Sequence, residues 1–123
     1  KSMEINTINL KDKLNTFEAY WTPKIVGGLN NQLVKLAKFK GDFVWHHHEN
    51  EDELFYVIEG ELFIELRDKT LHLKPGEFVI IPKGIAHRPY APEEVSVMLF
   101  EPATTLNTGN TESDLTQSDL ETI

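Results

Sequence analysis

The stretch GDFVWHHHENEDELFYVIEG, from Gly41 to Gly60, carries three consecutive histidines, an acidic loop and a run of apolar residues. Side chains alternate between the faces of a β-strand, so His46 and His48 share one face and His47 points to the other. Glu53 follows the acidic loop at the predicted start of the next strand, where a hairpin can return its carboxylate to the two rings. This combination is typical of a divalent metal site, although a polar strand explains the same residues.

Short β-type runs separated by turn residues lie on both sides of this stretch, as in antiparallel sandwiches and barrels. The dipeptide Pro75-Gly76 matches a type II turn, because proline fixes φ and glycine adopts positive φ. The same chemistry recurs at Pro82-Lys83-Gly84. We therefore predict an all-β domain with strands at Gln32–Lys40, Phe43–His48, Glu53–Ile58, Glu61–Leu66, Thr70–Leu73, Glu77–Ile81, Ala86–Tyr90 and Val95–Glu101.

The two ends of the chain differ from this β-rich centre. Leu10, Leu14 and Phe17 are spaced as on one face of a helix, which predicts one short amphipathic helix or helical turn that covers the core. Residues 103–123 contain four acidic residues and no basic or aromatic residue. A chain of 123 residues has room for one core. We expect an N-terminal segment with the helix over residues 1–30, a barrel over 31–102 and a polar acidic tail over 103–123.

Composition narrows the class of partner. The formal charge is −8, from 12 basic and 20 acidic residues, so we expect no nucleic-acid partner, which would need a basic surface. No apolar run approaches the ~20 residues that cross a membrane, and residues 1–6 lack the apolar core of a signal peptide. The absence of cysteine excludes disulfides and thiolate ligands and suits a reducing compartment. We expect a cytoplasmic protein with no membrane partner.

Two of the predicted strands are apolar on both faces. These strands are Leu54–Ile58 and Val95–Phe100, and each must be covered on both sides. A second sheet together with the N-terminal segment can cover them, or a second copy of the protein can do so. We expect a homodimer.

A second motif, GEFVIIPKGIAHRPYA, runs from Gly76 to Ala91 and places His87 just beyond a Pro-Gly turn. Together the two stretches resemble the cupin superfamily, whose motifs are G-x5-H-x-H-x(3 or 4)-E-x6-G and G-x5-P-x-G-x2-H-x3-N. The chain departs from these motifs where four residues, not five, separate Gly41 from His46, and where Ala91 replaces the final asparagine. Neither departure falls on a ligand position.

The resemblance implies a small single-domain cupin with a double-stranded β-helix, or jelly-roll. Such proteins are often labelled as similar to mannose-6-phosphate isomerase, a likeness that rests on the barrel, and a fold does not determine a reaction. The resemblance also implies one divalent transition metal, chosen from Fe, Mn, Ni, Zn, Co and Cu, held by His46, His48, Glu53 and His87. We interpret His47 as outward-facing, and His72, which alternates with two leucines, as solvated.

The ligand set leaves the function open. A six-coordinate ion keeps two positions for a small organic substrate, anionic or chelating, in a dioxygenase, an isomerase or a decarboxylase. By strand parity Val44, Phe55 and Val57 line an apolar cavity, and no residue is a convincing general base, so the catalytic residues are unknown. The alternatives are a module that binds or senses a small molecule or metal without turnover, and a purely structural cupin.

Overall fold

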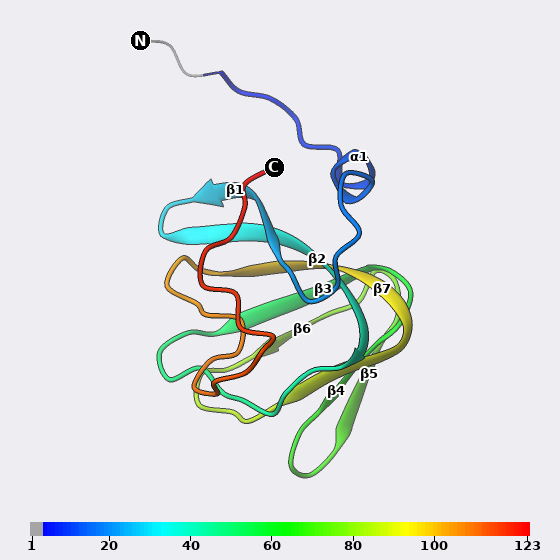
Figure 1. The fold of residues 1–123 in the computed structure, drawn as a ribbon, viewed down its shortest axis with the longest axis vertical. Coiled ribbons are helices and arrows are strands. Elements are labelled where there is room, and N and C mark those ends of the chain that lie inside the picture. The colour runs from blue at the N-terminus through cyan, green and yellow to red at the C-terminus, as the bar shows by residue number, and fades with distance from the viewer. Residues whose placement is uncertain (1–3) are drawn as a thin grey trace.

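The regular secondary structure of the chain is almost entirely β, as a computed structural model of residues 4–123 shows (Figure 1). The strands form an antiparallel jelly-roll barrel preceded by a short helix, which confirms the predicted fold class. No helix within these residues is long and apolar enough to span a membrane. The elements are α1 (Leu10–Leu14), β1 (Lys24–Leu29), β2 (Gln32–Asp42), β3 (Glu53–Glu59), β4 (Leu62–Glu65), β5 (Thr70–Leu73), β6 (Phe78–Ile81) and β7 (Arg88–Pro102).

The long strand β7 organises the barrel. It pairs with β2, β3 and β4, and the sheet runs in the order β1-β2-β7-β3-β6, with β5 on the far side of β4. The inward faces of these strands form the main core, which includes Phe39, Phe55, Val57 and Val97. Because β7 pairs with three other strands, residues that are distant in the sequence meet in one interior.

A smaller apolar cluster lies on the outer face of β2. Leu14 of α1 and Val26 of β1 are buried against Leu36, together with the partly buried Ile58 and Met98. The N-terminal segment thus covers one outward apolar surface, as predicted for the helix. This contact accounts for part of the two-sided apolar character of β3 and β7.

The predicted strand Phe43–His48 is wrong. These residues form a loop whose ladder pairing is reduced to an isolated bridge between His46 and His87. Phe43 donates a backbone hydrogen bond to the Pro89 carbonyl at 2.9 Å, but Pro89 has no N–H with which to return a bond. The ladder between the two segments is therefore interrupted at Pro89.

Two further boundaries differ from the prediction. The strand β1 was not predicted, because it falls within the expected N-terminal segment, and its Gly27-Gly28 pair is unfavourable in a strand. The predicted strands Ala86–Tyr90 and Val95–Glu101 are joined in one strand, β7, that runs through Pro92. The β2–β7 register shifts opposite this proline, so its missing N–H removes no ladder hydrogen bond.

Residues 103–123 contact the barrel along their length. Thr105 and Thr108 are buried, and Leu115 packs against the main core. At the C-terminus Ile123 donates a backbone hydrogen bond to the carbonyl of Ile25 in β1 at 2.9 Å. Figure 1 shows this segment, coloured orange to red, running beside the barrel and ending next to β1.

Candidate metal centre

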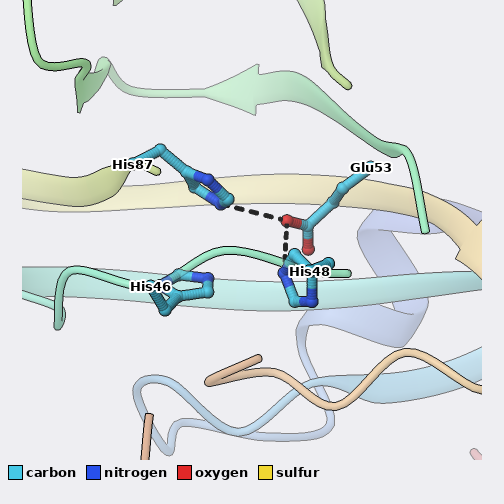
Figure 2. Close-up of side chains that lie close together, drawn as sticks. All are labelled: His46, His48, Glu53 and His87. Carbon is cyan, nitrogen blue, oxygen red and sulfur yellow. Dashed lines mark ion pairs between the residues drawn. The ribbon is translucent and has the colours of Figure 1, made fainter. Parts of the chain in front are cut away.

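The structure brings His46, His48, Glu53 and His87 together inside the barrel (Figure 2). Two histidines come from the loop after β2, Glu53 is the first residue of β3, and His87 immediately precedes β7. Each residue offers one donor atom, and the four donor atoms lie within 4.8 Å of one another. All four residues are at most 4% exposed.

The Glu53 carboxylate reaches between two of the rings. Its Oε1 lies 3.2 Å from His48 Nε2 and 3.5 Å from His87 Nε2 (Figure 2). All three atoms are buried, and none has a partner with hydrogen-bond geometry in the described part of the chain. Buried polar atoms are rarely left without a partner, so these atoms fit a site that binds a cation.

Backbone carbonyls fix the orientation of two rings. His46 Nδ1 donates to the Val44 carbonyl at 2.8 Å, and His87 Nδ1 donates to the Ile85 carbonyl at 2.8 Å. A carbonyl only accepts, so each Nδ1 carries the ring proton and each Nε2 keeps a lone pair. Metal-ligating histidines are commonly held in this way.

The electrostatics favour the unprotonated forms that bind metals. Burial lowers the pKa of His46 to about 4, and the neighbouring His87 adds to the effect. Burial alone would raise the pKa of Glu53, but its contacts with the His48 and His87 rings outweigh burial and hold this pKa well below its usual range. Neutral imidazole and ionised carboxylate are the ligand forms of these groups.

The His46 pKa predicts how the metal-free protein responds to acid. Between pH 6.5 and about 4 the unfolded chain protonates this ring and the folded chain does not, so the free energy of unfolding falls as the pH falls. The expected loss is about 3 kcal/mol, and the lowered Glu53 pKa adds a loss in the same direction at lower pH. Urea unfolding at several pH values, with His46→Asn as the comparison, measures it. An equally steep pH dependence in the variant would contradict the assignment.

The histidine loop is also held by the C-terminal segment. Asn110 accepts a hydrogen bond from the His47 N–H on its Oδ1 at 2.9 Å and donates its own N–H to the His47 carbonyl at 3.1 Å. Thr111 Oγ1 donates to the Trp45 carbonyl at 2.9 Å. Gly109 packs so closely that a Cβ there would lie 2.2 Å from the His47 carbonyl oxygen. Residues 109–111 therefore replace the strand partner that this loop lacks.

An aromatic cavity adjoins the four residues. It measures about 20 Å³, room for about one water molecule, and its polar lining is His46, Glu53 and Asn107. The apolar lining residues are Trp21, Pro23, Phe39, Phe43, Phe55, Pro89 and Leu99. Of the three residues predicted to line the cavity, Phe55 does so, and Val44 and Val57 do not. Phe43 lines the cavity from the histidine loop in place of Val44, and Val57 packs in the main core.

Trp21 was missed by the sequence analysis. It lies before β1 with a positive φ of 57°, and its ring stacks on Phe39 and Phe43 at centroid distances of 4.2 and 4.7 Å. No periodic pattern marks an aromatic residue in such a loop. Its side chain closes one side of the cavity.

The other two histidines lie outside the cluster, as predicted. The His47 side chain is 28% exposed, and its Nε2 lies 2.5 Å from Glu49 Oε1. The His72 side chain is 39% exposed, and its ring stacks on Phe63 and contacts Glu61. Neither residue belongs to the group of four buried donors.

Comparison with known proteins identifies the fold family. Residues 32–101 match the cupin domain family, an interval that contains both sequence motifs. A solved structure, that of a cupin-2 domain containing protein from Shewanella frigidimarina, superimposes with a TM-score of 0.77. It is 44% identical and covers 77% of this chain and 93% of that chain.

Curated relatives include oxygenases. The uncharacterized protein YdbB of Bacillus subtilis is 48% identical over 51% of this chain and 57% of its own length. Acireductone dioxygenase of Yarrowia lipolytica is 37% identical over 60% of this chain and 43% of its own length. The 3-hydroxyanthranilate 3,4-dioxygenase of Xenopus laevis is 29% identical over 76% of this chain and 36% of its own length. The chain thus spans between about a third and three fifths of the length of these relatives.

Proposed function

Since the chain belongs to the cupin family, we propose that its histidine and glutamate cluster binds one divalent transition metal in a dioxygenase that acts on a small chelating substrate. The observation that carries this proposal is the set of four buried donor atoms within 4.8 Å of one another. Three imidazole nitrogens and one carboxylate oxygen are a donor set that suits Fe, Mn, Ni, Zn, Co or Cu. The likeness to two dioxygenases supports the choice of reaction.

The site's charge and walls support a substrate class. A divalent ion and the Glu53 carboxylate together leave a net charge of about +1, which favours an anionic or chelating ligand. The bound ion would supply two further coordination positions, which a chelating substrate would fill with two donor atoms. A redox-active ion such as ferrous iron would also supply the chemistry for reaction of that substrate with dioxygen. The aromatic walls keep bulk water from the site and suit a substrate with an apolar body.

The test of this proposal is dioxygen consumption by protein loaded with one metal at a time. The chain is stripped with a chelator, loaded with Fe²⁺, Ni²⁺ or Zn²⁺, and supplied with 3-hydroxyanthranilate or an acireductone as probe. We expect metal-dependent dioxygen uptake with many turnovers for a redox-active ion and none for Zn²⁺. His47→Ala is the matched control for His48→Ala, and equal uptake in both variants would refute the proposed centre.

A second candidate is a binding or sensing module without turnover. The small volume of the cavity, about 20 Å³, favours a module that binds the metal itself, because an organic molecule enters only if the aromatic walls or the C-terminal segment move. The two functions are separated by calorimetry followed by mass spectrometry of the ligand. A probe that binds the metal-loaded protein and is recovered unchanged, with and without oxygen, supports the module and contradicts the enzyme.

We also propose that the chain forms a homodimer through the outer face of β6 and β3. Phe78 and Ile80 are 61% and 52% exposed, and they lie directly opposite Tyr56 and Leu54 on β3. On the other side of β3, Leu54 lies opposite Phe100. A continuous apolar surface on an unpaired edge strand suits a second copy of the same chain.

The variant Phe78→Lys/Ile80→Lys is expected to convert this dimer into a monomer, because like charges would be buried at the interface without partners. Sedimentation velocity at micromolar concentration measures the change. Leu29→Lys is the matched control, since Leu29 is 48% exposed on β1 at the opposite edge of the sheet. A monomeric wild-type protein, or a dimer that survives the double substitution, would contradict the proposal.

A further inference from the structure

The cavity beside the candidate metal centre is too small for an organic molecule. Its volume of about 20 Å³ holds about one water molecule, whereas pockets that bind small molecules measure about 300 to 1,000 Å³. The proposed function therefore requires that part of the wall moves when a substrate binds. The residues of the wall are held to different degrees, and this difference indicates which of them moves.

Much of the wall is fixed by hydrogen bonds of the backbone. Phe55 of β3 and Leu99 of β7 are paired neighbours in the sheet and are at most 4% exposed. Asn107 is bonded through both atoms of its amide, since its Nδ2 donates to the Leu115 carbonyl at 2.9 Å and its Oδ1 accepts from the Gln117 N–H at 2.8 Å. These residues cannot shift without breaking bonds of the barrel or of the C-terminal segment.

Trp21 contributes to the wall from the segment between α1 and β1. Its backbone N–H donates to the Lys38 carbonyl at 2.9 Å, and its indole Nε1 donates to the Lys40 carbonyl at 2.9 Å. Lys40 is exposed, so water can replace the indole at this carbonyl when the ring turns outward. The φ of 57° at Trp21 lies in the left-handed region, which bulky residues rarely adopt, and such strain is concentrated at functional sites and ligand clamps.

The rings around the indole define what can take its place. The phenyl rings of Phe39 and Phe43 stack on it at centroid distances of 4.2 and 4.7 Å, with interplanar angles of 12° and 17°. The Phe43 ring also lies edge-on to the ring of His46, a proposed metal ligand, at a centroid distance of 5.4 Å. A planar conjugated group in the place of the indole would therefore stack on the same two phenyl rings, next to the metal centre.

We propose that the Trp21 side chain is the gate of the metal cavity and selects substrates that carry a planar conjugated body beside their chelating atoms. Such a substrate takes the place of the indole on Phe39 and Phe43 and presents its chelating atoms to the metal. A planar body regains the stacking contacts that the indole gives up, whereas a saturated body does not. This inference rests on the proposed function.

The first test follows the fluorescence of Trp21 during ligand binding. Trp45 is the other tryptophan of the chain and lies outside the cavity lining, so Trp45→Phe leaves Trp21 as the only tryptophan. The probe is picolinate, a planar aromatic chelator, added to this variant loaded with Zn²⁺, and calorimetry measures its binding. We expect the emission to shift to longer wavelength and quenching by acrylamide to increase as picolinate binds, because the indole moves into water.

The second test removes the gate. Trp21→Gly deletes the indole and suits the positive φ. Picolinate enters the wild-type protein only when the indole has turned outward, and minor states of this kind are populated to about 0.1 to 10%, so we expect its association with Trp21→Gly to be about 10-fold faster or more. Stopped-flow mixing measures the rate, and thermal unfolding checks the fold of each variant.

Tyr20→Ala is the matched control for the rate. Tyr20 is the neighbouring aromatic residue, is 40% exposed and lies outside the cavity lining. Association with Tyr20→Ala should therefore be as slow as with the wild type.

Selection of a planar body is tested with pipecolate, which carries the same chelating nitrogen and carboxylate on a saturated ring. Each affinity for the Zn²⁺-loaded protein is divided by the affinity of the same chelator for free Zn²⁺. We expect the wild-type protein to favour picolinate about 10-fold after this correction, the effect of two stacked aromatic pairs. Equal corrected affinities would overturn the selection of a planar body.

Picolinate binding that leaves the emission and quenching of Trp21 unchanged would overturn the gate, and this measurement decides the question if Trp21→Gly does not fold. Equal association rates in the wild type and Trp21→Gly would also overturn it. Binding to Trp21→Gly alone would make Trp21 a fixed wall, and binding to neither protein would overturn the inference while leaving the metal site intact. A protein that binds no Zn²⁺ would refute the proposed function and this inference with it.

Discussion

Replacing His48 with Ala is expected to abolish tight binding of a divalent cation while leaving the barrel folded. His48 is one of four converging donors, and its Nε2 lies 3.2 Å from Glu53 Oε1. Loss of a ligand removes a direct bond to the metal, so the affinity should fall by more than the 10- to 100-fold typical of an outer partner. The fold should persist, because neither ring nitrogen of His48 has a hydrogen-bond partner within residues 4–123. Chelator competition with Co²⁺ or Zn²⁺ measures the change.

The control for this prediction is the neighbouring His47→Ala. His47 belongs to the same loop and is bonded to the C-terminal segment through its backbone, which the substitution leaves in place. Its side chain is partly exposed and contacts Glu49. Metal content should therefore equal that of the wild type. Equal metal content in the two variants, or loss of metal from His47→Ala alone, would mean that the proposed ligands are wrong.

The sequence predicts the cluster better than the backbone that carries it. Alternation places His46 and His48 on one side and His47 on the other, and this holds although the segment forms no strand ladder. Alternation requires only an extended chain, whereas a ladder requires paired N–H and carbonyl groups along both segments. The missing N–H of Pro89 is visible in the sequence, but its position opposite Phe43 depends on the barrel.

Residues that act through long-range contacts could not be found in this way. Lys35 lies in a predicted strand among apolar residues, where a lysine reads as solvent-facing, and its partner Glu101 is 66 residues away. Trp21 closes the cavity from a loop with no periodic pattern. The local sequence pattern indicates which face of a strand a residue occupies. The pairing of buried charges depends on which strands are neighbours in the sheet.

The contacts of the polar tail, residues 103–123, could not be predicted from local sequence patterns either. Its composition predicts a segment with little core of its own, but its backbone and side-chain amides satisfy groups on the histidine loop. Asn110 bonds both the N–H and the carbonyl of His47, and Asn107 reaches the cavity. A polar segment without helical or strand periodicity is interpreted as solvent-exposed chain when the partners of its hydrogen-bonding groups are not known. The C-terminal segment is thus placed to hold the histidine loop and to cover the site.

Replacing Gly109 with Ala is the sharpest test of that role. A Cβ at this position would lie 2.2 Å from the His47 carbonyl oxygen, closer than packed atoms allow, and 3.1 Å from His46 Cδ2, a tight contact. The positive φ of 55° adds a backbone cost of about 1 to 2 kcal/mol, and overpacking adds about 1 to 3 kcal/mol. The segment is expected to separate from the loop, which lowers the free energy of unfolding and exposes residues 103–123 to protease.

Gly76→Ala is the matched control, since Gly76 has a φ of 86° with no atom within 4 Å of the added Cβ. It should show the backbone cost alone, with no change in proteolysis of the C-terminal segment. In Gly109→Ala, Asn110 would lose both hydrogen bonds to His47, so the His46 and His48 rings would be less well held. Transfer of bound Co²⁺ to a chelator should therefore be faster in Gly109→Ala and unchanged in Gly76→Ala. Equal stability, proteolysis and Co²⁺ transfer in the two variants would show that the segment neither holds the histidine loop nor limits access to it.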